Sequence, residues 1–255
     1  MEVAQKFNLS GKVAVITGAS KGIGEAIGLA LGKAGAKVVV SSRKQEAVEE
    51  VAQVFRQAGI DAQAIACNTG QMEDNERLVK QVVELYGGID ILVNNAATNP
   101  IYGPIFEADV KALDKIMDVN LKGPFYLAKL CYPIMKQRGG GAVINIASIE
   151  GIKPSENLGI YSISKAALIM MTKVMANEMG KANIRVNAIC PGYIKTKLSE
   201  MVWNNQEMLD GVLSQQSIRH EGQPDDIAGI ALLLASGAGA FFTGSVVTVD
   251  GGMTV

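Results

Sequence analysis

Short apolar runs alternate with amphipathic patterns along the whole chain. The runs favour strands at seven places, over residues 13–17, 38–40, 60–66, 89–94, 142–147, 184–189 and 245–249. Most are nearly continuous in Val, Ile, Leu and Ala, which indicates strands that are buried on both faces. Such strands form a parallel sheet that is covered by helices.

Helical patterns fill the intervals between these runs. Apolar residues recur at helical spacing over 23–31 and 48–55, and Gly35 and Gly59 end these two helices. Further helices are predicted over 75–86, 161–181 and 225–235, with a long helical stretch before the fifth strand. Right-handed crossovers between parallel strands then give a doubly wound α/β fold, whose ligands bind at the carboxyl ends of the strands.

The chain of 255 residues has the length of one large α/β domain, and no repeat or linker divides residues 1–255. The segment 197–221 breaks the alternation of strand and helix and contains the only tryptophan, Trp203. We interpret this segment as a lid over the substrate.

Charge and cysteine content narrow the functional classes. The net charge is −1 with both signs interspersed, which argues against a nucleic-acid or anionic-membrane partner. Cys67, Cys131 and Cys190 have no metal-ligand spacing and are interpreted as reduced, buried thiols, so no metal is expected. No apolar segment has the length of a membrane span or the position of a signal core. A cytoplasmic protein is expected.

The loop after the first predicted strand is rich in glycine. Its candidate cofactor-binding residues are Gly18, Ser20, Lys21, Gly22, Ile23 and Gly24. Glycine permits a tight turn and close approach of the backbone, and the following helix offers free N–H groups to a pyrophosphate. A glycine-rich turn without a ligand is the alternative, which the position in the first strand–helix unit disfavours.

The end of the second strand indicates which dinucleotide is bound. NAD-binding folds place a carboxylate there, about 20 residues after the glycine loop, to bind the ribose 2′-hydroxyl. This chain instead has Ser42 and Arg43, which suit a 2′-phosphate. NADP is therefore predicted and NAD is the alternative, in which case Arg43 and Lys44 only begin a helix.

Three Tyr-x-x-x-Lys pairs occur in the chain, at Tyr132, Tyr161 and Tyr193. Only Tyr161 has a serine thirteen residues before it, Ser148, at the end of an apolar run. Tyr161, Lys165 and Ser148 are the candidate catalytic residues, because a phenol, an ammonium and a hydroxyl can protonate a carbonyl as it receives a hydride.

The glycine loop, Asn94-Asn95-Ala96-Ala97, Asn120, Ser148, Tyr161/Lys165 and Pro191-Gly192 follow one another in this order. This set resembles the short-chain dehydrogenase/reductase family. The resemblance implies a single Rossmann-type domain with a seven-stranded sheet, and a homotetramer formed through the long fourth and fifth helices and the last strand. Ala97-Thr98-Asn99-Pro100 and Met201-Val202-Trp203 are similar to an NADPH-dependent carbonyl (retinal) reductase branch of it.

The resemblance also implies roles for individual residues. Asn95 and Ala96 would line the adenosine ribose, and Asn68, where the family usually has Asp, would contact the adenine. The nicotinamide end would be held by Pro191, Gly192, Ile194 and Thr196, and its ribose by Lys165. Asn120 would hold a water that links Lys165 to solvent.

A tyrosine has a pKa of about 10, which burial raises further, whereas the charge of Lys165 favours the phenolate. We expect Tyr161 to donate a proton to the carbonyl oxygen in reduction and to remove it in oxidation, while Ser148 binds the same oxygen. The single histidine, His220, lacks a nucleophile elbow, so a Ser-His-Asp triad is disfavoured.

The predicted activity is an NADP-dependent oxidoreductase that interconverts a small-molecule ketone or aldehyde and an alcohol. A 3-oxoacyl-thioester reductase of the same family and a non-catalytic NADP-binding regulatory protein are the alternatives. The substrate's identity and the direction of the reaction are left open by the sequence. The candidate substrate-lining residues are Glu150, Asn157, Tyr193 and Trp203, with Ile149, Leu158 and Met208 beside them.

Overall fold

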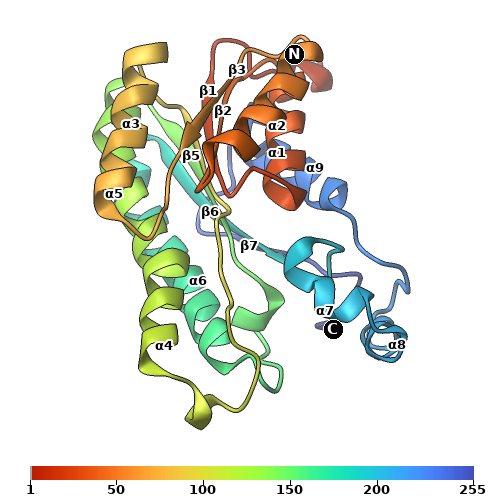
Figure 1. The fold of residues 1–255 in the computed structure, drawn as a ribbon. Helices are drawn as coiled ribbons and strands as arrows, with labels where there is room; N and C mark the ends of the chain where they lie inside the picture. Colours follow the sequence, from red (N-terminus) through yellow and green to blue (C-terminus); the bar gives the residue numbers. More distant parts are fainter. Residues whose placement is uncertain (1) are drawn as a thin grey trace.

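Residues 2–255 are described by the computed structural model, and within them a seven-stranded parallel sheet forms the centre of the molecule (Figure 1). Its strands, in chain order, are β1 (Val13–Thr17), β2 (Lys37–Ser42), β3 (Ala62–Ala66), β4 (Ile91–Asn94), β5 (Gly141–Ile146), β6 (Ile184–Pro191) and β7 (Val246–Val249). Their order in the sheet is β3-β2-β1-β4-β5-β6-β7. The direction of winding reverses between β1 and β4, which is where doubly wound sheets bind their ligands.

Helices cover both faces of the sheet (Figure 1). One face is covered by α1 (Gly22–Lys33), α2 (Gln45–Gln57) and α9 (Pro224–Ala235), and the other by α3 (Met72–Tyr86), α5 (Gly123–Gln137) and α6 (Gly159–Met179). Successive side chains of β1 point to opposite faces of the sheet. Ala14 and Ile16 pack in the core under α1 and α9, whereas Val13 and Val15 pack in the core under α3 and α5. This division explains the continuous apolar runs, because a strand between two helical layers buries every side chain.

The predicted elements are present with small shifts at their ends. The runs at 60–66 and 89–94 begin as strands only at Ala62 and Ile91, although Ile60 and Ile89 are buried before them. The long helical stretch before β5 consists of α4 (Val110–Met117), a π-helical turn (Asp118–Lys122) and α5. Short 3-10 turns lie at Val3–Phe7, Ile105–Glu107, Ile149–Gly151, Gly180–Ala182 and Gly237–Gly239.

The segment 197–221 lies beyond the carboxyl ends of the strands (Figure 1). It contains a 3-10 turn at Lys197–Ser199, α7 (Glu200–Trp203) and α8 (Gln206–Ser214). Across the described chain, no helix combines the length and apolar character needed to cross a bilayer.

Candidate active site

Ser148, Tyr161 and Lys165 meet at the carboxyl end of β5. Ser148 follows that strand, and α6 presents Tyr161 and Lys165 from its first two turns. The Lys165 Nζ atom donates a 2.8 Å hydrogen bond to the Ile146 carbonyl and lies 5.6 Å from the centre of the Tyr161 ring. The side chains of Ser148 and Tyr161 are close enough for the serine hydroxyl to act on the phenol. Tertiary structure therefore brings together the three residues that the sequence singles out.

Burial dominates the electrostatics of this group. It raises the pKa of Tyr161 to about 12, against which the Ser148 hydroxyl acts in the lowering direction. Lys165 is only 2% exposed, and burial lowers its pKa to about 8. The sequence predicts that burial raises the pKa of the Tyr161 phenol, and the structure agrees. That the charge of Lys165 favours the phenolate stays a prediction.

Asn120 lies in the π-helical turn between α4 and α5 and is fully buried. Its Oδ1 accepts from the Thr98 N–H at 2.8 Å, and its Nδ2 donates to the Thr98 carbonyl at 3.0 Å and to Ser164 Oγ at 3.1 Å. The side-chain amide thus ties the loop after β4 to α6. The water that would link Asn120 to Lys165 stays a prediction, and π turns of this kind are frequent at functional sites.

The glycine loop and the start of α1 leave no room for a side chain at Gly18 or Gly24. Gly18 and Gly22 have φ angles of 64° and 62°, which favour glycine. A Cβ atom on Gly24 would lie 2.5 Å from Asn95 Nδ2 and 2.7 Å from the Gly18 carbonyl oxygen. Asn95 Nδ2 itself donates to the carbonyls of Thr17 and Gly18, at 2.9 and 3.0 Å. The amide of Asn95 therefore holds the loop, and its predicted contact with the ribose stays a prediction.

The residues expected around the adenosine lie along the same edge of the sheet. Ser42 ends β2, with Arg43 exposed directly after it. Asn68 follows β3, and its Oδ1 accepts from the Gly70 N–H at 3.3 Å. Ser20 and Ile23 are partly buried in the glycine loop, Lys21 is exposed there, and Ala96 donates its N–H to Thr17 Oγ1 at 3.1 Å.

The residues expected at the nicotinamide end come from the loop after β6. Gly192 donates its N–H to the Val249 carbonyl at 2.9 Å, and Pro191 and Ile194 are buried. Thr196 Cγ2 lies 3.3 Å from the position that a Cβ atom on Gly22 would occupy. The loop after β6 therefore packs against the glycine loop. Two distant parts of the sequence therefore lie side by side there, as the predicted cofactor site requires.

The side chains of Glu150, Tyr193 and Trp203, three of the predicted substrate-lining residues, already make hydrogen bonds within the protein. The Glu150 carboxylate accepts hydrogen bonds from Ser155 and Ser162. Tyr193 donates its hydroxyl to Glu221 at 3.3 Å, and Trp203 donates Nε1–H to the Thr196 carbonyl at 2.9 Å. Asn157 has a left-handed φ of 67°, and its carbonyl accepts from the Gly103 N–H. Their contact with a substrate stays a prediction.

Cys190 belongs to the site, although the sequence suggests only a buried thiol. It is fully buried near the end of β6, and it acts on the pKa values of both Tyr161 and Lys165. Burial raises its own pKa to about 11. The signal in the sequence is its position directly before Pro191, at the carboxyl end of a strand.

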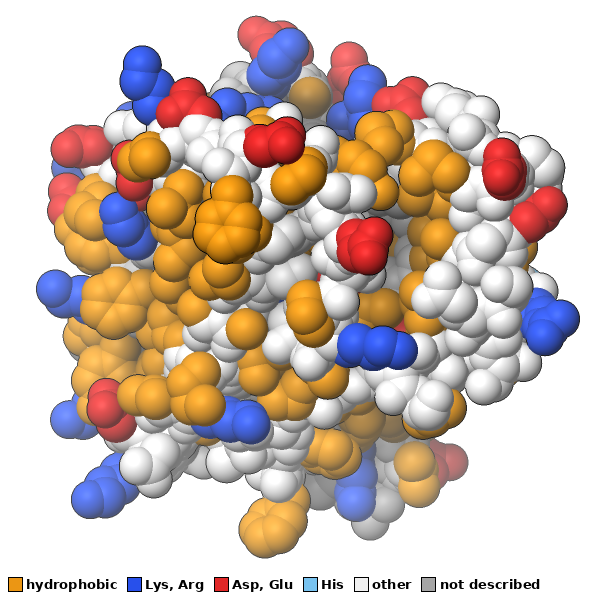
Figure 2. Space-filling model, turned by 90° about the horizontal axis from the view of Figure 1, so that it is seen from below, with side chains coloured by type: hydrophobic (Ala, Val, Ile, Leu, Met, Phe, Trp, Pro, Cys, Tyr) orange, Lys and Arg blue, Asp and Glu red, His pale blue; other side chains and the backbone are white. Residues whose placement is uncertain are grey.

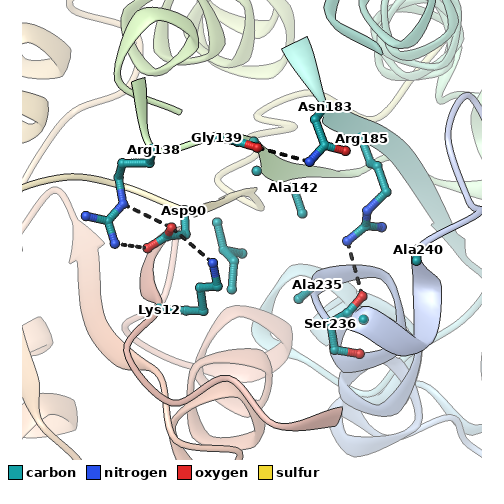
Figure 3. Close-up of a pocket in the computed structure, with 14 residues that line it drawn as sticks. Lys12, Asp90, Arg138, Gly139, Ala142, Asn183, Arg185, Ala235, Ser236 and Ala240 are labelled. Atoms are coloured by element: carbon teal, nitrogen blue, oxygen red, sulfur yellow. Dashed lines mark hydrogen bonds and ion pairs between the residues drawn. The ribbon is translucent and has the colours of Figure 1, made fainter. Parts of the chain in front are cut away.

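A separate cavity of about 300 Å³ opens at the amino ends of the strands (Figure 3), and none of the three candidate catalytic residues lines it. On one side Arg138 and Lys12 pair with the buried Asp90, at 2.8 and 3.5 Å. On the other side Arg185 donates to the Leu234, Ser236 and Gly239 carbonyls near the end of α9. These cations neutralise a buried carboxylate and the negative end of a helix, which is a structural role.

Known proteins resemble this chain over nearly its whole length. A family model described as enoyl-(acyl carrier protein) reductase matches residues 18–254. Dehydrogenase/reductase SDR family member 4 of Homo sapiens is 43% identical over 244 residues, covering 96% of this chain and 88% of the human protein. The protein of the same name from Caenorhabditis elegans is 38% identical over 247 residues, covering 95% of both chains.

Solved structures show the same fold. A gluconate 5-dehydrogenase from Burkholderia cenocepacia, in complex with NADP and tartrate, superposes with a TM-score of 0.95 at 31% identity and covers 99% of both chains. A 7α-hydroxysteroid dehydrogenase complexed with NADH and 7-oxo glycochenodeoxycholic acid also has a TM-score of 0.95, at 35% identity, covering 99% of this chain and 98% of the other.

Proposed function

This chain belongs to the short-chain dehydrogenase/reductase family of oxidoreductases, and we propose that it is an NADP-dependent enzyme interconverting a ketone or aldehyde and an alcohol. The observation that carries the proposal is the meeting of Ser148, Tyr161 and Lys165 beside the loop after β6, which packs on the glycine loop. Proton donors and a predicted dinucleotide site at one edge of the sheet suit hydride transfer to a carbonyl.

The protein residues divide the work of the reaction. Bound NADPH would supply the hydride for the carbonyl carbon. Tyr161 gives its hydroxyl proton to the carbonyl oxygen as negative charge develops there, and Ser148 donates a hydrogen bond that fixes the same oxygen. In the oxidative direction Tyr161 takes the alcohol proton back. Acid–base help of this kind is typically worth about 10²–10⁴ in rate.

Lys165 acts in two ways in this scheme. When protonated, its ammonium group favours the phenolate that remains after proton transfer. Its Nζ atom, held by the Ile146 carbonyl, would also bind the nicotinamide ribose. Asn120, in the π turn, would hold the water that connects Lys165 to solvent.

The choice of NADP rests on residues of this chain. Arg43 and Ser42 stand where an NAD-binding protein has a carboxylate, and Lys21 adds positive charge in the glycine loop. Asn68, Asn95 and Ala96 would complete the adenosine side, and Pro191, Gly192, Ile194 and Thr196 the nicotinamide side. Of the two solved relatives named above, one holds NADP and the other NADH, so NAD is the alternative.

A 3-oxoacyl thioester is the second candidate substrate. The family model that matches residues 18–254 is described as enoyl-(acyl carrier protein) reductase, which supports the class of acyl thioesters but names reduction of a C=C bond and not of a 3-oxo group. The exposed segment 197–221 would act as a lid in either case, with Glu150, Asn157, Tyr193 and Trp203 near the substrate.

We also propose a cytoplasmic homotetramer. Apolar side chains gather on the side of the molecule where α4 and α6 lie (Figure 2). Exposed apolar residues of α4, α5 and α6 include Val110, Phe125, Ile163, Met170 and Val174. Phe241 and Phe242, ahead of the edge strand β7, are exposed as well. Light scattering after gel filtration tests this assembly, and a monomeric mass would contradict it.

Initial-rate oxidation of NADPH and of NADH, each with a panel of ketones, diketones, aldehydes and acetoacetyl-coenzyme A, tests the activity. Turnover that favours NADPH is expected, with ketones or aldehydes ahead of the thioester. A preference for the thioester would select the second candidate. Tight binding of NADPH without turnover of any of these carbonyls would contradict the proposed activity and favour a specialised substrate or a regulatory role.

A further inference from the structure

Glu150 is bonded through both its backbone and its side chain. Its backbone N–H donates to Ser148 Oγ at 3.1 Å. Its carboxylate Oε2 accepts from the Ser155 N–H at 2.8 Å and from Ser162 Oγ at 3.0 Å, and Oε1 accepts from Ser155 Oγ at 2.6 Å. One residue thereby connects Ser148, the loop that leads to α6, and the first turn of α6, where Ser162 is next to Tyr161.

We propose that Glu150 is a positioning residue for the oxidoreductase reaction, which holds Ser148 and the first turn of α6 with Tyr161 in register, and not a ligand of the substrate. This inference rests on the proposed function of Ser148 and Tyr161. The carboxylate accepts its three hydrogen bonds from protein donors, which lie in the loop before α6 and on α6 itself.

The packing of the turn on α6 makes this connection possible. Glu150 lies in the 3-10 turn Ile149–Gly151. A Cβ atom on Gly151 would lie 2.7 Å from the Lys165 carbonyl carbon and 2.8 Å from the Ala166 nitrogen. The turn thus rests directly on the backbone of the helix. This close approach holds the two elements together where the Glu150 carboxylate bonds Ser162, which is only 5% exposed.

The backbone contact also orients the Ser148 hydroxyl. A serine hydroxyl has one proton to donate and two lone pairs that accept. The Glu150 N–H occupies one lone pair of Ser148 Oγ. The hydroxyl proton is then free to point at Tyr161 or at a carbonyl oxygen, which is the direction that the reaction needs.

Charge is the second effect of Glu150. Besides burial, the groups that act on the Tyr161 phenol are the Ser148 hydroxyl after β5, the Glu150 carboxylate and Cys190 on β6. Lys165 on α6 faces the ring, with its Nζ atom 5.6 Å from the ring centre. Glu150 raises the pKa of Tyr161. Removing its negative charge should therefore lower that pKa and allow the phenol to lose its proton at lower pH.

Three variants separate the hydrogen bonds of the Glu150 carboxylate from its negative charge. Glu150→Gln removes the charge and retains an amide that can still bond the serines, whereas Ser162→Ala removes a contact and retains the charge. Glu156→Gln is the control, because Glu156 is an exposed glutamate of the same loop. For each protein, kcat and kcat/KM for alcohol oxidation are measured across pH, where the rate rises as Tyr161 loses its proton.

In Glu150→Gln, the rising limb of the pH–rate profile for alcohol oxidation should move to lower pH by about 0.5–1 unit, as expected for the loss of one partly screened charge. Ser162→Ala should lower kcat about 3- to 10-fold without moving the limb, the size of one lost hydrogen bond. Glu156→Gln should match the wild type. If Glu150→Gln raises KM alone and leaves the limb in place, Glu150 is a substrate ligand and the proposal is overturned.

A readout without turnover separates this proposal from the proposed function. Hydrogen exchange of the Ser155 amide should accelerate in Glu150→Ala, which removes its acceptor, and unchanged exchange would overturn the link. Absence of wild-type turnover on every carbonyl would instead overturn the proposed function, and it would be seen before any variant is compared.

Discussion

The Lys165 Nζ atom lies 5.6 Å from the centre of the Tyr161 ring, one helical turn along α6. Residues four apart on a helix share a face, so the relationship follows from the local fold. The hydroxyl of Ser148 is placed beside these two residues by β5, which ends two residues before Ser148.

Tyr161→Phe should lower kcat for carbonyl reduction by about 10²–10⁴, because the general acid is lost, while NADPH affinity stays within about threefold. Tyr132→Phe is the matched control, since Tyr132 also precedes a lysine by four residues but lies on α5. Stopped-flow reduction and NADPH fluorescence titration measure the two quantities. Full turnover by Tyr161→Phe would contradict the assignment.

Lys165→Met should stabilise the cofactor-free protein near neutral pH while abolishing most activity. Burial lowers the Lys165 pKa to about 8, against about 10.4 in the unfolded chain, so protonation disfavours the folded state. This cost is complete below the folded pKa, and it disappears as pH rises through the unfolded pKa. Urea unfolding should show a gain of about 1–3 kcal/mol at pH 7 that shrinks toward pH 10. A pH-independent difference would contradict it.

Arg43→Ala should reduce the preference for NADPH over NADH by about 10- to 100-fold, the value of one or two charge-assisted hydrogen bonds to a phosphate. The ratio of kcat/KM for the two cofactors measures this. Lys33→Ala is the control, because Lys33 is an exposed cation at the far end of α1. An unchanged ratio would mean that Arg43 only begins α2.

Gly24→Ala should weaken NADPH binding at least tenfold, because the added Cβ would lie 2.5 Å from Asn95 Nδ2 and displace the loop that Asn95 holds. Gly229→Ala is the control. Gly229 is exposed in α9, and a Cβ there meets nothing within 4 Å. That control should gain about 0.5–1 kcal/mol in stability by helix propensity. Isothermal titration with NADPH gives the affinities, and equal values for the two variants would contradict binding at the glycine loop.

Arg138→Ala should lower the free energy of unfolding by about 1–3 kcal/mol. Asp90 is 3% exposed and would keep only the Val13 N–H and Lys12 as partners. Arg77→Ala removes an arginine from the more exposed Asp74 and should cost less than about 1 kcal/mol. Thermal and urea unfolding of the two variants make the comparison. Equal losses would show that Asp90 needs no Arg138.

The sequence by itself determined the layers and singled out the candidate catalytic residues. Buried strands and amphipathic helices have distinct periodicities, so the parallel sheet between helices could be predicted. The starts of two strands, predicted at Ile60 and Ile89, lie two residues later in the structure. The four-residue spacing of Tyr161 and Lys165 is a property of any helix. Glycine at positions 18 and 24 marks places with no space for a side chain.

Only the tertiary structure decided where the remaining polar groups point. Asn95 holds the glycine loop, Asn120 ties Thr98 to Ser164, and Glu150 bonds Ser155 and Ser162. Cys190 likewise joins the site through the adjacency of β5 and β6. Such partners are chosen by hydrogen-bond geometry between segments far apart in the chain, and a polar residue type alone does not encode its partner.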